Sequence, residues 1–174
     1  VADAFSRVSN GKRFGVCTVQ GAINAAGLEY ATGAITQAFE DSTPLLVLSD
    51  GAPIGETEHS HYHPDRVFAN ITKWSAYVDQ PKRVPDFMAR AFTQLKTGRP
   101  GPVLLQVPLG LGEYEEERPY EPVPAWKPQA DPDAVKVAVK TLLAAKKPLL
   151  YAGQGVFYAD ACEELRQFAE LMQL

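Results

Sequence analysis

The pattern that organises the chain is a helical stripe followed by a buried strand, within residues 28–53. Apolar side chains recur at three- and four-residue steps, which places them on one face of a helix: Leu28, Ala31, Ile35, Ala38 and Phe39. Asp41-Ser42-Thr43-Pro44 ends this helix, because proline cannot continue the hydrogen-bond ladder. Residues 45–48 form an apolar run typical of a strand covered on both faces. The pattern predicts a helix–strand unit that ends at Ser49-Asp50-Gly51.

The same alternation of helical stripes and apolar strands continues on both sides of this unit. It predicts one helix that ends at Ser9-Asn10-Gly11, a second over residues 84–95 and a short third one near 67–71. It also predicts strands over residues 14–20, 73–78 and 103–108. Such alternation indicates an α/β fold, a parallel sheet with right-handed crossovers and helices on both faces. Ligands of open α/β sheets bind beyond the carboxyl ends of the strands, so we expect a site within residues 49–63.

A segment of different character follows this sheet. Residues 113–131 are first acidic and then rich in proline, which favours an extended interdomain linker over a long surface loop of the same domain. The sequence thus predicts a sheet domain over 1–112, a linker over 113–131, and the start of a second α/β unit over 132–174.

The second unit opens with a well-marked helix. Asp131 is a good N-cap with Pro132 at the first helical position, and a strand is expected over residues 148–152. Gly153-Gln154-Gly155 follows that strand. This turn either cradles a phosphate or is a plain tight turn, and Tyr158 at the third glycine position of the dinucleotide fingerprint favours the plain turn.

The composition of the chain bears on its classes of binding partner and on its cellular compartment. With 174 residues, 45% apolar content, a net charge of −4 and a pI of about 5.4, the chain resembles a globular protein and shows no electrostatic preference for nucleic acid or anionic membranes. Cys17 and Cys162 are expected to be reduced core thiols, and the default location is the cytoplasm. Val1 already reads as mid-helix and Leu174 falls where a strand is due, so we expect a piece of a longer protein.

Two clusters of polar residues are candidates for chemistry. His59, His61 and His63 would share one face of an extended chain, and three readings stay open: a zinc site, active-site proton transfer, and a solvated loop. Gln20 and Glu29 stand near the start of the helix over residues 28–39, where free N–H groups suit a polar cofactor. Alternatively, Glu29 merely complements the helix dipole.

Five motifs follow one another along the chain: Val1–Arg7, Gly15–Gln20, Thr36–Leu48, Ile71–Trp74, and Gly98-Arg99-Pro100-Gly101-Pro102 with the strand to Pro108. They resemble those of thiamine-diphosphate enzymes of the acetolactate synthase-like superfamily, and the last motif is the most specific. In order and spacing they resemble the family's pyrimidine-binding domain, here without its N-terminal part. Residues 131–174 resemble the start of its Rossmann-like central domain. The resemblance covers nearly the whole chain.

The resemblance implies a set of cofactor residues. The family's cofactor loop corresponds to Ala25–Tyr30, in which only Gly27 is retained, and Gly51 replaces a glutamine that often follows the central strand. Gln20, Gly27, Glu29 and Gly51 would then form the wall around the aminopyrimidine of thiamine diphosphate. The family's activating glutamate precedes the position of Val1, and the domain that binds the diphosphate and Mg²⁺ is also absent from this chain. FAD fits the family as well, but no residue here indicates it.

The resemblance also implies an activity. The intact protein would be a carboligase or decarboxylase of a 2-oxo acid, with acetolactate synthase as the nearest guess, and would form a homodimer or homotetramer. This chain alone would be inactive. Some decarboxylases of the family carry paired histidines in the corresponding loop, so His59 or His61 is predicted to protonate the substrate, and His63 to be structural. The alternative is a degenerate, non-catalytic structural or regulatory member.

Overall fold

The structure is a computed structural model of the chain. It describes residues 1–21, 26–51, 62–113, 121 and 124–174. The chain divides into two compact units, Val1–Trp126 and Lys127–Leu174, which are treated separately below. The division falls inside the linker expected over residues 113–131, and the exact bounds of that linker stay a prediction.

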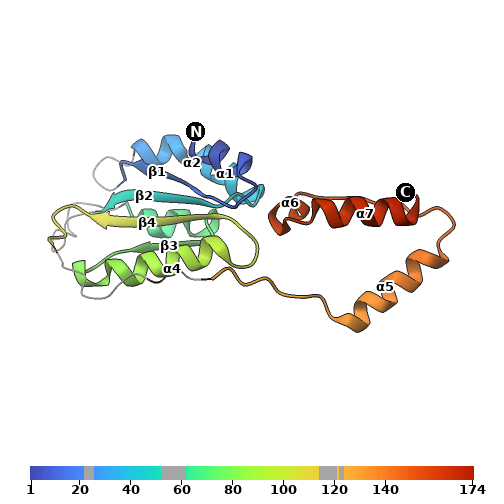
Figure 1. Cartoon of the computed structure of the whole chain (residues 1–174). Coiled ribbons are helices and arrows are strands. Elements are labelled where there is room, and N and C mark those ends of the chain that lie inside the picture. Colours follow the sequence, from blue (N-terminus) through green and yellow to red (C-terminus); the bar gives the residue numbers. More distant parts are fainter. Residues whose placement is uncertain (22–25, 52–61, 114–120, 122–123) are drawn as a thin grey trace. The chain divides into compact units, whose positions relative to one another are not determined.

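The first unit is built on a four-stranded parallel sheet (Figure 1). Its strands lie in the order β1-β2-β4-β3. Along the chain the elements are α1 (Ala2–Val8), β1 (Gly15–Val19), α2 (Ala26–Glu40), β2 (Leu45–Gly51), α3 (Pro64–Val67), η2 (Phe68–Asn70), β3 (Trp74–Tyr77), η3 (Pro81–Arg83), α4 (Val84–Lys96) and β4 (Pro102–Pro108). The predicted α/β fold with a parallel sheet is therefore confirmed.

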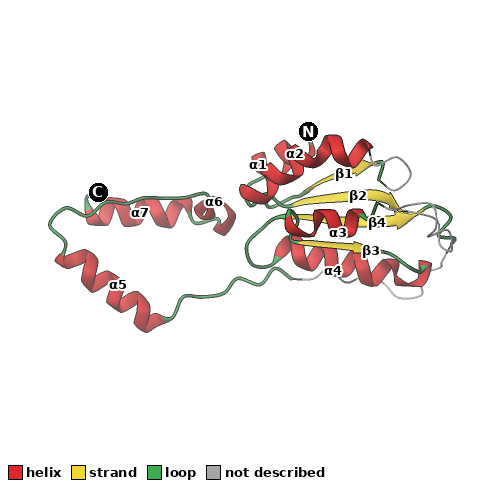
Figure 2. Cartoon of the chain, turned by 180° about the vertical axis from the view of Figure 1, so that it is seen from behind, coloured by secondary structure: helices red, strands yellow, loops and turns green. Residues whose placement is uncertain are grey.

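Helices cover both faces of this sheet, as Figure 2 shows. Alternate residues of each strand face opposite sides, so the buried strands contribute to two apolar clusters. One joins α2 and η2 to the sheet through Leu28, Ile35, Ala38, Leu45, Val47, Phe68 and Leu104. The other joins α4 to the opposite face through Leu46, Ala91, Leu95, Val103 and Leu105. The stripe predicted for residues 28–39 thus packs on the sheet.

A buried serine joins α1 to the sheet. Ser6 Oγ donates to the carbonyl oxygen of Pro44 at 2.6 Å and accepts from the backbone N–H of Gly15 at 2.7 Å. Ser6 has no exposed surface, so water cannot replace either bond. The hydroxyl therefore fixes the end of α1 to the start of both β1 and β2.

Ser6→Ala is expected to lower the free energy of unfolding by about 1–3 kcal/mol, because it leaves a buried N–H and a buried carbonyl without a partner. Ser9→Ala is the matched control, since Ser9 Oγ also makes backbone hydrogen bonds but the one to Arg13 O, at 2.7 Å, is exposed to water. We expect a loss of at most about 0.5 kcal/mol there. Urea denaturation measures both, and equal losses would contradict the argument.

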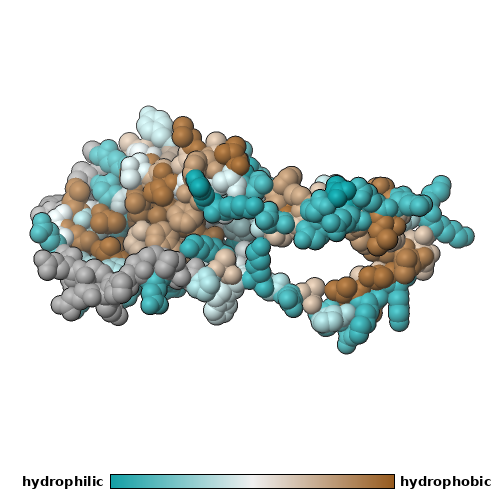
Figure 3. Space-filling view, viewed as in Figure 1, coloured by the Kyte–Doolittle hydropathy of each residue, from teal (hydrophilic) through white to brown (hydrophobic). Residues whose placement is uncertain are grey.

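The second unit consists of α5 (Pro132–Ala144), α6 (Gly155–Ala159) and α7 (Cys162–Met172). The predicted capping of α5 is confirmed, because the Asp131 side chain accepts from the Asp133 N–H at 2.9 Å. The half-buried residues of α7 include its predicted stripe: Leu165, Phe168, Ala169 and Met172. Large apolar side chains remain on the surface of this unit (Figure 3), among them Val137 and Leu143 of α5.

Two sequence predictions for the second unit are wrong. Residues 148–152 form no strand, and Leu149 and Tyr151 are 88% and 94% exposed. A strand needs a neighbour for its N–H and C=O groups, and the described part of this unit, residues 127–174, contains no other strand to supply one. Both cysteines are free as expected, but only Cys17 is half-buried, where burial raises its thiol pKa; Cys162 is exposed rather than in a core.

Candidate functional site

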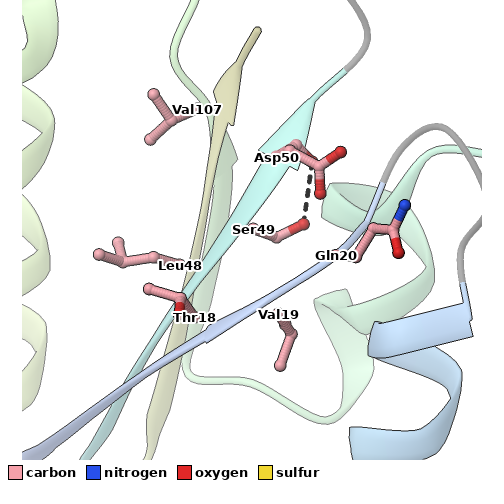
Figure 4. Close-up of a pocket in the computed structure, with 7 residues that line it drawn as sticks. All are labelled: Thr18, Val19, Gln20, Leu48, Ser49, Asp50 and Val107. Carbon is pink, nitrogen blue, oxygen red and sulfur yellow. Dashed lines mark hydrogen bonds between the residues drawn. The ribbon is translucent and has the colours of Figure 1, made fainter.

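An open cavity of about 460 Å³ lies at the carboxyl ends of β1 and β2, beside β4 (Figure 4). It is lined by Thr18, Val19, Gln20, Leu48, Ser49, Asp50 and Val107. This is the edge at which ligands of open α/β sheets bind. The cavity therefore lies where the sequence predicted a site, and it includes the first residues of the expected 49–63 segment.

The rim of the cavity is held by polar contacts between the ends of β1 and β2. The Asp50 carboxylate accepts a hydrogen bond from the Gly21 backbone N–H, and Ser49 Oγ donates to the Asp50 carbonyl oxygen at 2.9 Å. Gly21 is required here, because a Cβ on it would overlap Ser49 Oγ and lie 2.8 Å from the Asp50 carbonyl oxygen. The two strand ends are thus in close contact.

The remaining lining is mixed in polarity. Val19, Leu48 and Val107 supply apolar surface, whereas the exposed amide of Gln20 and the hydroxyl of Thr18 supply donors and acceptors. Concave sites with apolar walls and a few fixed polar groups suit small organic ligands.

Gln20 is the one predicted cofactor residue that lines the cavity. Gly27 lies beside it in the first turn of α2. A Cβ on Gly27 would come within 2.6 Å of the Gln20 carbonyl oxygen, which also accepts from the Leu28 N–H at 3.0 Å. Gly27 therefore lets the start of α2 pack against the residue that follows β1. The roles of Gln20 and Gly27 toward a cofactor stay predictions.

Glu29 and Gly51 lie outside the cavity lining. Glu29 is exposed on α2. The pKa of Tyr62 is raised mainly by burial and, to a smaller extent, by the negative charge of Glu29. Gly51 is buried at the end of β2, and a Cβ on it would lie 2.8 Å from a ring carbon of Tyr77, whose own pKa burial raises. Gly51 thus leaves room for the ring of Tyr77, which comes from β3 on the far side of β4. Its contact with a cofactor stays a prediction.

The predicted catalytic residues His59 and His61 lie outside the described residues. His63 is described and exposed, and it precedes α3. Its carbonyl oxygen accepts from the backbone N–H groups of Arg66 and Val67 at 2.9 and 3.0 Å, whereas its side chain makes no capping hydrogen bond. The imidazole of His63 therefore does not cap α3.

Sequence reasoning did not single out Thr18, Ser49 or Asp50 as site residues. Ser49 and Asp50 stand inside the expected segment, whereas the family resemblance implies only Gly51 there. Their signal is the change from apolar to polar residues at the end of a buried strand. For Thr18 the signal is weaker, because a polar residue inside an edge strand is common.

The described residues include neither a cluster of metal ligands nor a helix that could span a membrane. Residues 1–21, 26–51, 62–113, 121 and 124–174 contain no group of three or more His, Cys, Asp or Glu residues placed to hold a metal ion. No helix in that part of the chain has the length and apolar character needed to cross a bilayer.

Comparisons with known proteins bear on both units. Residues 135–174 match the family model for the central domain of thiamine pyrophosphate enzymes. The chain is 33% identical over 98% of its length to a glyoxylate carboligase from Escherichia coli O157:H7, and 34% identical over 91% to the acetolactate synthase large subunit of Corynebacterium glutamicum. It spans only 29% and 26% of those two proteins.

A solved structure has the same fold. It is the Rhodococcus jostii RHA1 thiamine diphosphate-dependent 4-hydroxybenzoylformate decarboxylase, which matches 98% of this chain with a TM-score of 0.79. The match covers 33% of that protein's chain, at 22% sequence identity. At this identity the likeness concerns the fold alone.

Proposed function

Because this chain belongs to the acetolactate synthase-like superfamily of thiamine-diphosphate enzymes, we propose that it is part of a longer enzyme acting on a 2-oxo acid. That enzyme would be a carboligase or a decarboxylase. The observation that carries the proposal is similarity over at least 91% of the chain to both a carboligase and an acetolactate synthase. The cavity at the carboxyl edge of the sheet supports it.

We propose that the cavity holds the aminopyrimidine half of thiamine diphosphate. Its volume of about 460 Å³ exceeds what a single small ring needs, and it combines apolar walls with the amide of Gln20. The Gln20 amide would orient the ring, and Gly27 would keep the start of α2 close to Gln20. The family resemblance adds Glu29 and Gly51 to the proposed cofactor residues, although neither lines the cavity. When bound, the cofactor supplies a nucleophile for the keto carbon and an electron sink for the decarboxylation.

The rest of the machinery would lie outside this chain. We propose that Mg²⁺ and the diphosphate are bound by another domain of the intact protein.

Within this chain, His59 or His61 would donate a proton to the substrate-derived carbanion, a role for which imidazole is suited near neutral pH. We further propose a cytoplasmic homodimer or homotetramer, without nucleic-acid or membrane partners.

Calorimetry on the complete protein tests this proposal. Titration with thiamine diphosphate in the presence and absence of Mg²⁺ should show tight, magnesium-dependent binding. The alternative from the sequence is a degenerate structural or regulatory member, because the cofactor loop retains only Gly27 of the family pattern. Failure to bind the cofactor under either condition would favour that alternative.

Gln20→Ala in the complete protein should weaken thiamine diphosphate binding about threefold to tenfold, the effect of losing one net hydrogen bond. The control is Gln37→Ala, because Gln37 is an exposed glutamine of α2 that does not line the cavity. Its dissociation constant should equal that of the wild type. If the two variants bind the cofactor equally well, Gln20 is not a cofactor residue.

A further inference from the structure

A buried glutamine next to the cavity makes hydrogen bonds to two separate elements. Gln106 lies in β4 and is only 2% exposed. Its Nε2 donates to the Asp50 carbonyl oxygen at 3.4 Å, and its Oε1 accepts from the Asp65 backbone N–H, in α3, at 3.1 Å. A flipped amide would face a donor with a donor and an acceptor with an acceptor, so both partners together select this orientation.

The two partners of this glutamine are themselves hydrogen-bonded to the other strands. The Asp50 carbonyl also accepts from Ser49 Oγ, and the Asp50 carboxylate holds the Gly21 N–H at the end of β1. The Asp65 carbonyl accepts from Ser75 Oγ of β3 at 2.5 Å. A continuous set of hydrogen bonds therefore connects Gly21, which follows β1, with β2, β4, α3 and β3.

Core packing alone does not explain a glutamine at this position. Leu104 precedes it by two residues on the same face of β4 and is fully buried in the apolar cluster under α2. An apolar residue at 106 would continue that cluster, whereas an amide must recover its lost hydration through hydrogen bonds. What the amide adds is a fixed position for the Asp50 peptide and for the first turn of α3.

We propose that Gln106 is a positioning residue for the cavity. Gln106 does not itself line the cavity, but it donates to the carbonyl oxygen of Asp50, which does. It would thereby keep Asp50 and Ser49 in the rim geometry that the proposed aminopyrimidine site needs. The inference rests on the proposed function. Side chains that bind ligands need such support, because a displacement of well under an ångström is enough to weaken a preorganised site.

The test uses two variants of the complete protein. Gln106→Met keeps the length of the side chain but removes both hydrogen bonds, and should weaken thiamine diphosphate binding about tenfold. Gln106→Asn keeps the amide but is too short to reach both partners, and should fall between Gln106→Met and the wild type. For both variants, kcat at saturating thiamine diphosphate should stay within about twofold of the wild type. The reason is that the substitutions weaken the binding of the cofactor and leave the chemical step unchanged. If Gln106→Met does not fold, Gln106→Asn decides.

Val103→Ala is the matched control, because Val103 is fully buried near the opposite end of β4 and makes none of these hydrogen bonds. It should lower the melting temperature yet bind the cofactor as the wild type does. Hydrogen exchange of the Asp65 amide without cofactor should accelerate in Gln106→Met and not in Val103→Ala.

Wild-type cofactor affinity in the Gln106 variants, or equal weakening in Val103→Ala, would overturn the inference and leave the proposed function standing. A wild-type protein that binds no thiamine diphosphate would overturn both. The exchange rate of the Asp65 amide separately reports whether the hydrogen bond to Gln106 exists.

Discussion

Replacement of either His59 or His61 by alanine is expected to lower the turnover of the complete enzyme by about 10²–10⁴-fold, the range typical of general acid catalysis. Both histidines follow β2 in the sequence, and β2 ends at the edge where the cavity lies. An imidazole titrates near neutrality and can protonate a carbanion, so the loss should fall on turnover and leave cofactor affinity unchanged. Steady-state kinetics with a 2-oxo acid, together with calorimetry, measures the two quantities.

His63→Ala is the control within the same group of histidines. The His63 side chain is exposed and makes no capping hydrogen bond, and the alanine variant keeps the backbone carbonyl that accepts from Arg66 and Val67. Its turnover should stay within about twofold of the wild type, as for a surface change without partners. If both His59→Ala and His61→Ala keep the wild-type turnover, the prediction is wrong and the histidines belong to a solvated loop.

The fold of the first unit was predictable because each of its elements has a clear local pattern. The end of β2 was less so. Its apolar run stops at Leu48, yet the strand continues to Gly51, because Asp50 and Gly51 still pair with Val107 and Pro108 of β4. The converse holds for residues 148–152, an apolar run without a neighbouring strand in the described part of its unit. Strand formation depends on the partner as much as on the run itself.

The position of the cavity could be predicted from the sequence, but most of its lining residues could not be named. The carboxyl-edge rule requires only a buried strand and the residues that follow it. The contact between Gly21 and Asp50 requires that β1 and β2 be neighbours, and the bridge through Gln106 requires β4 beside β2. Strand order is a long-range property, and no spacing along the chain reports it.

The largest effect on stability is expected from Gly15→Ala, at the first residue of β1. A Cβ on Gly15 would lie 2.6 Å from the carbonyl carbon and 2.7 Å from the Cα of Ala2, and closer still to the Ala2 carbonyl oxygen. These are backbone atoms of α1, which cannot rotate out of the way as a side chain can. The extra methyl group can therefore be accommodated only if α1 moves away from β1.

Movement of α1 would break several other interactions. Ser6 Oγ accepts from the Gly15 N–H and donates to the Pro44 carbonyl oxygen, and Arg7 forms an ion pair of 2.8 Å with Asp41. The ion pair with Asp41 joins α1 to the end of α2, so it resists the displacement as well. Gly15→Ala should therefore lower the free energy of unfolding by about 3 kcal/mol, the upper end of the usual cost of overpacking.

Gly33→Ala provides a control with the same chemical change and the opposite expected sign. A Cβ on Gly33 meets no atom within 4 Å, and the residue is exposed in the middle of α2. Alanine there should raise the free energy of unfolding by about 0.5–1 kcal/mol, because glycine weakens a helix interior. Urea denaturation of both variants measures the difference. A Gly15→Ala protein as stable as the wild type would show that α1 does not pack on β1 through a contact that only glycine permits.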